Sequence, residues 1–128
     1  MGMSVGSAIV RAVLVENRAI RWAGSAAYAD LDDLVDAIGR VAGEGSGAGR
    51  PQRVRVVLER PVAQVRTVVP APPLGEAAAR RWVGLEAPRL FRKNGAALLT
   101  DARVVALSKT SRALFAGAVA EPHVRAIL

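Results

Sequence analysis

The chain of 128 residues is long enough for one domain with a hydrophobic core, because 52% of its residues are hydrophobic. It contains no cysteine, which excludes disulfides and thiol chemistry, and no apolar run approaches the ~20 residues of a membrane-spanning helix. The formal net charge of +7 comes almost wholly from arginines scattered along the chain, a pattern that favours a basic composition over a dedicated nucleic-acid or membrane surface.

The first predicted element is a β-hairpin. Residues 7–15 and 18–24 are largely apolar, and Asn17 lies at the break between them. Asparagine is favoured in tight hairpin turns, so we place the turn there. Residues 26–29 add a short third strand to this prediction.

A helix is predicted next, because Asp30 is a good N-cap and apolar residues recur at helical spacing from Leu31 to Ala42. Gly43 ends this predicted helix, and residues 43–51 are expected to form a flexible, glycine-rich loop within the domain. The loop does not fit a phosphate-binding loop, because its glycines follow a helix and precede a strand.

Two strands are predicted to follow. Residues 53–58 indicate a strand buried on both faces, and because a helix precedes it we expect parallel pairing with an earlier strand. A turn at Pro61 leads to a second strand over 62–69, and Pro70 prevents its continuation.

The next helix is predicted from about 75 to 87, with Ala78, Trp82 and Leu85 on one apolar face and Pro88 at its end. Trp82 is therefore interpreted as a buried core residue.

Three further elements are predicted in the last third of the chain. Residues 96–100 and 103–107 are expected to form a second hairpin, and a helix is expected to start at Ser108 or Lys109. Residues 123–128 are expected to begin another strand. The predicted fold class is therefore α/β, a single domain over 1–128 with a mixed β-sheet of about five or more strands flanked by helices.

A family resemblance rests on the order of elements predicted between 53 and 91, which is strand, proline turn, strand, proline stop and helix. The segment from Val62 to Pro70 and the pair Arg81-Trp82 also carry it. It resembles the first domain of the PilM-like, actin-like pilus-assembly proteins and the cytoplasmic domain of type II secretion protein L. The resemblance covers nearly the whole chain in order and spacing. It implies an RNase H-like, actin-like half-domain, whose second half is not in this sequence.

The family's first strand carries Asp-x-Gly-Ser and, three residues on, Lys. Here Gly6 and Ser7 match, Arg11 replaces the Lys, and Ser4 stands at the place of the Asp. The resemblance thus implies Gly6, Ser7 and Arg11 as nucleotide-binding positions. Because the family's Asp lies near the nucleotide's metal and phosphates, we expect no cofactor in this chain alone, and Mg-ATP only with a second half.

The resemblance implies a non-catalytic, cytoplasmic scaffold or adaptor of a type IV pilus or type II secretion machine, peripheral to the inner membrane. Its partner would be a short segment of a bitopic inner-membrane protein, with the membrane contacted only indirectly. Two alternatives remain open. They are half of an actin-like ATP-binding module, and a basic nucleic-acid-binding domain of RNase H-like shape.

No metal or catalytic site is predicted. His123 is the only histidine, so no second imidazole can join it, and the acidic residues between Asp30 and Asp36 fit favourable charge at a helix start.

A dense basic segment offers a candidate partner-binding surface, with two aromatic residues among its charges. A solvated face is the plainer interpretation, and nucleic acid is the less favoured partner. Its basic residues are Arg80, Arg81, Arg89, Arg92 and Lys93.

A sheet edge is also expected to stay unpaired, at the predicted hairpin over 96–107 and the predicted strand over 123–128. Exposed edges pair readily with other strands, so we predict a homodimer or strand addition there.

Overall fold

The structure, a computed structural model, describes residues 1–49, 51, 53–92 and 95–128. Contacts among these residues divide the chain into two compact units. The first comprises residues 1–62 and 122–128, and the second comprises residues 63–121. The prediction of one domain over 1–128 did not distinguish these units, because the chain passes from one to the other without a linker-like stretch.

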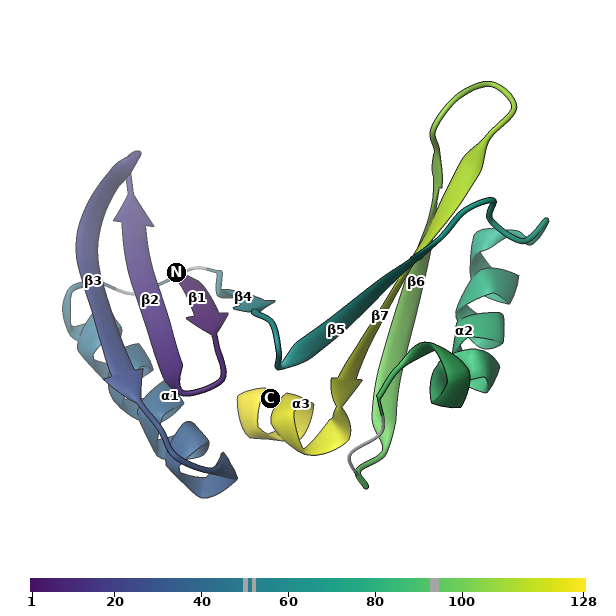
Figure 1. Ribbon diagram of the computed structural model, residues 1–128. Helices are drawn as coiled ribbons and strands as arrows, with labels where there is room; N and C mark the ends of the chain where they lie inside the picture. Colours follow the sequence, from purple (N-terminus) through teal and green to yellow (C-terminus); the bar gives the residue numbers. More distant parts are fainter. Residues whose placement is uncertain (50, 52, 93–94) are drawn as a thin grey trace. The chain divides into compact units, whose positions relative to one another are not determined.

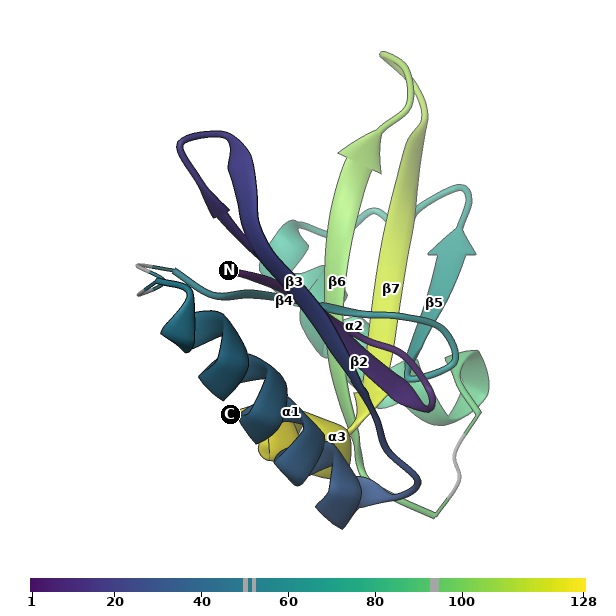
Figure 2. The same cartoon turned by 90° about the vertical axis from the view of Figure 1, so that its left-hand side faces the viewer.

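The first unit is built from β1 (Gly2–Val5), β2 (Ile9–Glu16), β3 (Ala19–Ala27), α1 (Leu31–Gly47), β4 (Arg55–Leu58) and most of α3 (Glu121–Ile127). Its four strands form one sheet in the order β3-β2-β1-β4, with α1 packed on one face (Figures 1 and 2). β1 pairs antiparallel with β2 and parallel with β4. The largest side chains fully buried in this core belong to Val5, Val10, Leu34 and Val41.

The predicted first hairpin is confirmed. β2 and β3 pair antiparallel, and Asn17 and Arg18 between them have φ values of 50° and 63°. Two consecutive residues with positive φ are the signature of the turn that matches the twist of a hairpin. β1 was not predicted, because four residues at the start of a chain are too few to show an alternating pattern.

Helix α1 begins as predicted and ends later than predicted. The Asp30 carboxylate accepts hydrogen bonds from the backbone N–H groups of Asp32 and Asp33, each at 3.0 Å. The helix then continues to Gly47, so the prediction of a loop over 43–51 is wrong for its first five residues. Arg50, also within that loop, lies outside the described residues. The helix passes through the glycines because Gly45 is buried against the sheet, where packing outweighs helix propensity.

β4 differs from its prediction in one respect. It pairs parallel with β1 as expected, but it lies at the edge of the sheet instead of being buried on both faces. Val56 and Val57 of β4 are exposed, with 39% and 62% of their surfaces accessible to solvent, and Val54 just before the strand is 55% exposed. The continuous apolar run therefore does not mark a central strand here.

The second unit consists of β5 (Ala63–Val68), α2 (Glu76–Leu90), β6 (Leu98–Ala106) and β7 (Arg112–Ala120). Its three strands form an antiparallel sheet in the order β5-β7-β6. α2 covers one face and buries Ala79, Val83 and Ala87 against Leu114 and its neighbours on the sheet. Figure 1 shows α2 lying along this sheet.

The predictions for the last third of the chain are wrong in three places. Residues 98–106 form one continuous strand, β6, instead of a hairpin, and residues 112–120 form the strand β7 instead of a helix. Residues 121–127 form the helix α3 instead of a strand. β7 was misread because its small apolar residues satisfy both periods, whereas burial of Leu114, Ala116 and Ala118 follows the strand period of two.

The apolar face of α2 is also rotated from its prediction. Leu85 is 81% exposed and Trp82 is only partly buried, whereas Ala79, Val83 and Ala87 form the core stripe. Pro88 lies in the last turn, where it removes one backbone hydrogen bond without ending the helix. Within the described residues, no helix has both the length and the apolar character needed to cross a membrane.

Candidate functional site

The positions carried over from the resemblance lie around the turn between β1 and β2. Ser4 on β1 lies opposite Arg11 on β2 and beside Val57 on β4. Glu59 follows β4 directly, and its backbone N–H donates to the carbonyl of Val5 at 2.8 Å. The parallel pairing of β1 with β4 therefore brings a carboxylate to the strand end that carries Ser4.

Glu59 is the charged centre of this group. The Ser4 hydroxyl donates a hydrogen bond to Glu59 Oε1, and Arg11 Nη1 lies 3.5 Å from the same oxygen. Arg11 and Glu59 are both substantially solvent-exposed, so the ion pair contributes little to stability. Sequence reasoning missed Glu59, because only the strand order reveals that the residue after β4 faces Ser4.

Gly6 has no backbone group to spare for a ligand. Its N–H donates to the carbonyl of Ile9 at 3.0 Å, and its carbonyl accepts a hydrogen bond from the Tyr28 hydroxyl. Partial burial raises the pKa of the Tyr28 phenol. A Cβ at Gly6 would lie 3.0 Å from Glu59 Oε2, so the carboxylate fills the space that glycine leaves.

Ser7 faces a different environment from Arg11. It lines a shallow pocket together with Tyr28, Asp30, Asp32 and His123. Carboxylates are the wrong charge for phosphate, and Glu59 balances the charge of Arg11. The structure thus brings Ser4, Gly6 and Arg11 around Glu59, while Ser7 belongs to an acidic pocket.

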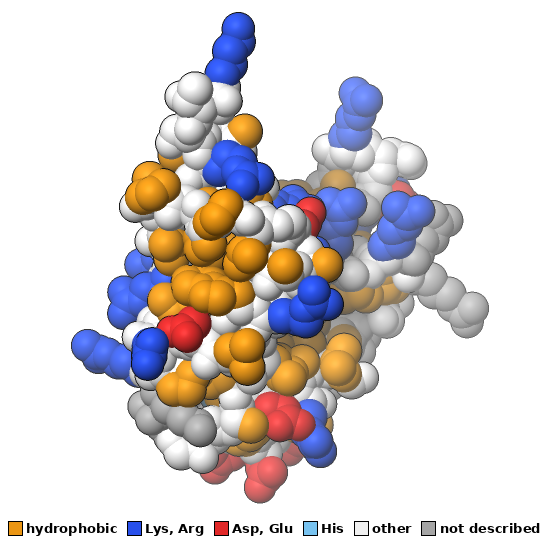
Figure 3. Space-filling view, turned by 90° about the vertical axis from the view of Figure 1, so that its right-hand side faces the viewer, with side chains coloured by type: hydrophobic (Ala, Val, Ile, Leu, Met, Phe, Trp, Pro, Cys, Tyr) orange, Lys and Arg blue, Asp and Glu red, His pale blue; other side chains and the backbone are white. Residues whose placement is uncertain are grey.

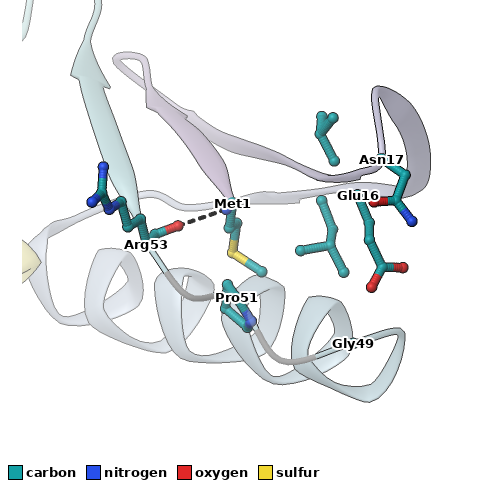
Figure 4. Close-up of a pocket in the computed structure, with 8 residues that line it drawn as sticks. Met1, Glu16, Asn17, Gly49, Pro51 and Arg53 are labelled. Carbon is teal, nitrogen blue, oxygen red and sulfur yellow. Dashed lines mark hydrogen bonds between the residues drawn. The ribbon is translucent and has the colours of Figure 1, made fainter.

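A second pocket in the first unit contains none of the predicted site residues (Figure 4). It lies between the chain start, the β2–β3 turn and the segment that follows α1. The amino group of Met1 donates to the carbonyl of Arg53 at 2.7 Å, and the Glu16 carboxylate pairs with Arg21 Nε at 3.0 Å. The Met1 amino group and the Glu16 carboxylate are thus already engaged within the protein.

The predicted basic surface is not one surface. Arg80 and Arg89 stand about two and a half turns apart on α2, which places them on opposite sides of the helix. Arg89 pairs with Glu86 at 3.3 Å, and Lys93 lies outside the described residues. Arg81 is exposed. Seen from the side of α2, hydrophobic side chains lie among separate Lys and Arg side chains (Figure 3).

Arg80 has a structural role at the outer edge of β6. Its guanidinium lies 3.0 Å from Asp101 Oδ1 and 3.2 Å from Glu76 Oε1, and its Nε is 3.4 Å from the carbonyl of Ala102. Asp101 Oδ1 in turn accepts the backbone N–H of Ala102 at 2.8 Å. Both backbone groups of Ala102 are thus occupied, which blocks this part of the edge against another strand.

The end of α2 is held by two side chains of β5. Gln64 accepts the backbone N–H of Arg92 and donates to its carbonyl, each at 2.8 Å, while Arg66 Nε donates to the carbonyl of Leu90 at 3.1 Å. The backbone N–H and carbonyl of Arg92 at this helix end are therefore bonded within the protein. Sequence reasoning missed this contact, because nothing local to 64–66 indicates a helix terminus elsewhere in the chain.

Within the described residues, no three His, Cys, Asp or Glu side chains converge in a way that could hold a metal ion. The candidate site is therefore a structural cluster of Ser4, Arg11 and Glu59 that joins three strands of the first sheet, with the Gly6 turn beside it.

No family model matches the chain, and no curated protein matches it. Among solved structures, it is similar to the cytoplasmic domain of EpsL, an inner membrane component of the type II secretion system of Vibrio cholerae. The two share 20% sequence identity with a TM-score of 0.51, and the match covers 98% of this chain.

The match covers 49% of the EpsL domain, so this chain spans about half of its length. At this level of identity the likeness shows the fold alone. The predicted α/β fold class is confirmed, although the strands form two sheets of four and three strands instead of one. The fold agrees with the predicted resemblance to the cytoplasmic domain of type II secretion protein L, and the resemblance to the PilM-like proteins stays a prediction.

Proposed function

We propose that this chain is a non-catalytic, cytoplasmic scaffold or adaptor domain of a type II secretion or type IV pilus machine, peripheral to the inner membrane. The observation that carries the proposal is the likeness of fold to the EpsL cytoplasmic domain along 98% of the chain. A domain of this kind would dock a short segment of a bitopic inner-membrane protein.

The non-catalytic part of the proposal is supported by the turn after β1. A phosphate-binding turn offers free backbone N–H groups to the ligand. Here the Gly6 N–H is bound to Ile9, and the Glu59 carboxylate lies against the glycine. A phosphate at this turn would therefore meet a negative charge and no free donor at Gly6.

Isothermal titration with Mg-ATP tests this part. We expect no measurable binding by the chain alone, and micromolar affinity would contradict it. A Glu59→Gln variant serves as the matched comparison, because it removes the charge while keeping the side-chain size. Weak ATP binding gained only by that variant would identify Glu59 as the group that excludes phosphate.

The adaptor part is tested with peptides. Synthetic peptides covering the cytoplasmic segments of the bitopic inner-membrane proteins of the organism's own secretion and pilus machines are titrated against the chain by fluorescence anisotropy. We expect saturable binding by one of them and none by its scrambled version. Failure of every peptide to bind would overturn the docking role.

A further inference from the structure

We propose that two copies of this chain associate through β4, which pairs antiparallel with β4 of a second copy about a two-fold axis at Val57. The inference is independent of the proposed function. It starts from the position of β4, which pairs with β1 on one side and with no other described strand on its second side.

The backbone of β4 has hydrogen-bonding groups available on that second side. The N–H groups of Arg55 and Glu59 donate toward β1, to the carbonyls of Met1 at 2.9 Å and Val5 at 2.8 Å. Because these groups alternate in direction along a strand, those of Val56 and Leu58 point to the free edge. An edge of this kind is a template for another strand.

Among the described residues, no side chain bonds to the outward backbone groups of β4, whereas such bonds are present on β6. At Ala102 of β6, Arg80 and Asp101 occupy both outward backbone groups. Between Arg55 and Glu59, the residues of β4 are apolar, and Val57 is 62% exposed. An apolar edge strand with exposed side chains favours association.

A second copy fits this edge because the strand is complementary to itself. With the two-fold axis at Val57, Val56 lies opposite Leu58 of the second copy, so the outward backbone groups of both residues meet in a hydrogen-bonded pair. Val57 then lies opposite its own equivalent in a pair without hydrogen bonds.

The same register pairs opposite charges. Arg55 lies opposite Glu59 of the second copy, and the symmetry repeats this contact at the other end of the interface. Opposite charges across neighbouring strands are favourable, and like charges are unfavourable. A shift of the axis to Val56 would place Arg55 opposite valine and lose both charge pairs. Because the strand is short, the interface is small and association should depend on concentration.

The absence of cysteine allows a direct test by cross-linking. In a pair without hydrogen bonds the Cα atoms are about 4.5 Å apart, which lies within the range that a disulfide spans. A Val57→Cys variant should therefore form a disulfide-linked dimer under mild oxidation. Val56→Cys and Val65→Cys are matched controls, since Val56 faces Leu58 of the second copy and Val65 belongs to β5. Both should cross-link at least tenfold more slowly.

A charge exchange gives an independent readout by sedimentation. Arg55→Glu alone and Glu59→Arg alone should each be more monomeric than the unaltered chain, because each places like charges across the interface. A mixture of the two variants should restore the dimer, because both contacts then join opposite charges. Circular dichroism confirms that each variant is folded.

Three results would overturn the proposal. The first is an unaltered chain that stays monomeric at ~1 mM, a concentration far above the dissociation constants of stable dimers. The second is a Val57→Cys variant that cross-links no faster than Val65→Cys, and the third is a mixture of the two charge variants that fails to restore association. A strand from a different protein on this edge would leave the chain alone monomeric and so would appear as the first of these results.

Discussion

The indole ring of Trp22 on β3 packs directly against Gly45 of α1. A Cβ at Gly45 would lie 3.1 Å from Cε3 and Cζ3 of the ring, and it would also overlap the end of the Met1 side chain. The same ring covers Gly24, two residues further along β3. A glycine in the last turn of α1 is thus explained by the close approach of the helix to an aromatic ring.

The glycines of α1 should therefore respond in opposite ways to alanine. Gly43→Ala meets nothing within 4 Å and should stabilise the chain by about 0.5–1 kcal/mol through helix propensity. Gly45→Ala should destabilise it by about 1–3 kcal/mol, because the added methyl overpacks the core. Urea unfolding measures both. If the Gly45 variant is as stable as the Gly43 variant, the close packing is wrong.

Substitutions on the observed core stripe of α2 and on the stripe predicted from the sequence should differ in their effect on the free energy of unfolding. Val83 is fully buried and Val83→Ala should cost about 2–3 kcal/mol, whereas Leu85→Ala should change stability by less than about 0.5 kcal/mol. Trp82→Ala should lie between the two, because its ring is partly exposed. A large loss on Leu85→Ala would show that the predicted stripe through Leu85 is the core face after all.

The blocked edge of β6 predicts a gain of self-association when it is unblocked. An Arg80→Ala, Asp101→Ala double variant exposes the backbone groups of Ala102, so light scattering should increase with concentration. Arg103→Ala is the control, since Arg103 is on the same strand and its Nε lies 3.9 Å from Glu76 Oε1, a long ion-pair distance. Equal scattering by the two variants would mean that the edge is protected in another way.

We predict weak binding of nucleic acid, because Arg80 and Arg89 lie on opposite sides of α2 and each pairs with a carboxylate. If all five basic residues between 80 and 93 bound single-stranded DNA, affinity would fall on the order of a hundredfold between about 50 and 200 mM salt. Because Arg80 and Arg89 are paired, we expect no appreciable binding at about 150 mM salt. Tight binding there, lost in an Arg80→Glu, Arg81→Glu variant, would favour the nucleic-acid alternative.

Local chemistry made one turn and one helix start in the first third of this fold predictable. The turn at Asn17 and the cap at Asp30 are short-range signals, and both are present in the structure. β7 was not predictable in the same way, because its alanines fit a helix as well as a strand and the choice depends on pairing with β5 and β6. Glu59 was missed for a similar reason, since its contact with Ser4 exists only after two distant strands align.

The hold of β5 on the end of α2 has a consequence for cooperativity. Gln64 and Arg66 bind Arg92 and Leu90, so the last turn of the helix depends on a strand that lies far earlier in the chain. Any opening that lifts β5 from β7 must also release these carbonyls to water. We therefore expect the last turn of α2 and the strand β5 to exchange their amide hydrogens together, as one unit of local unfolding.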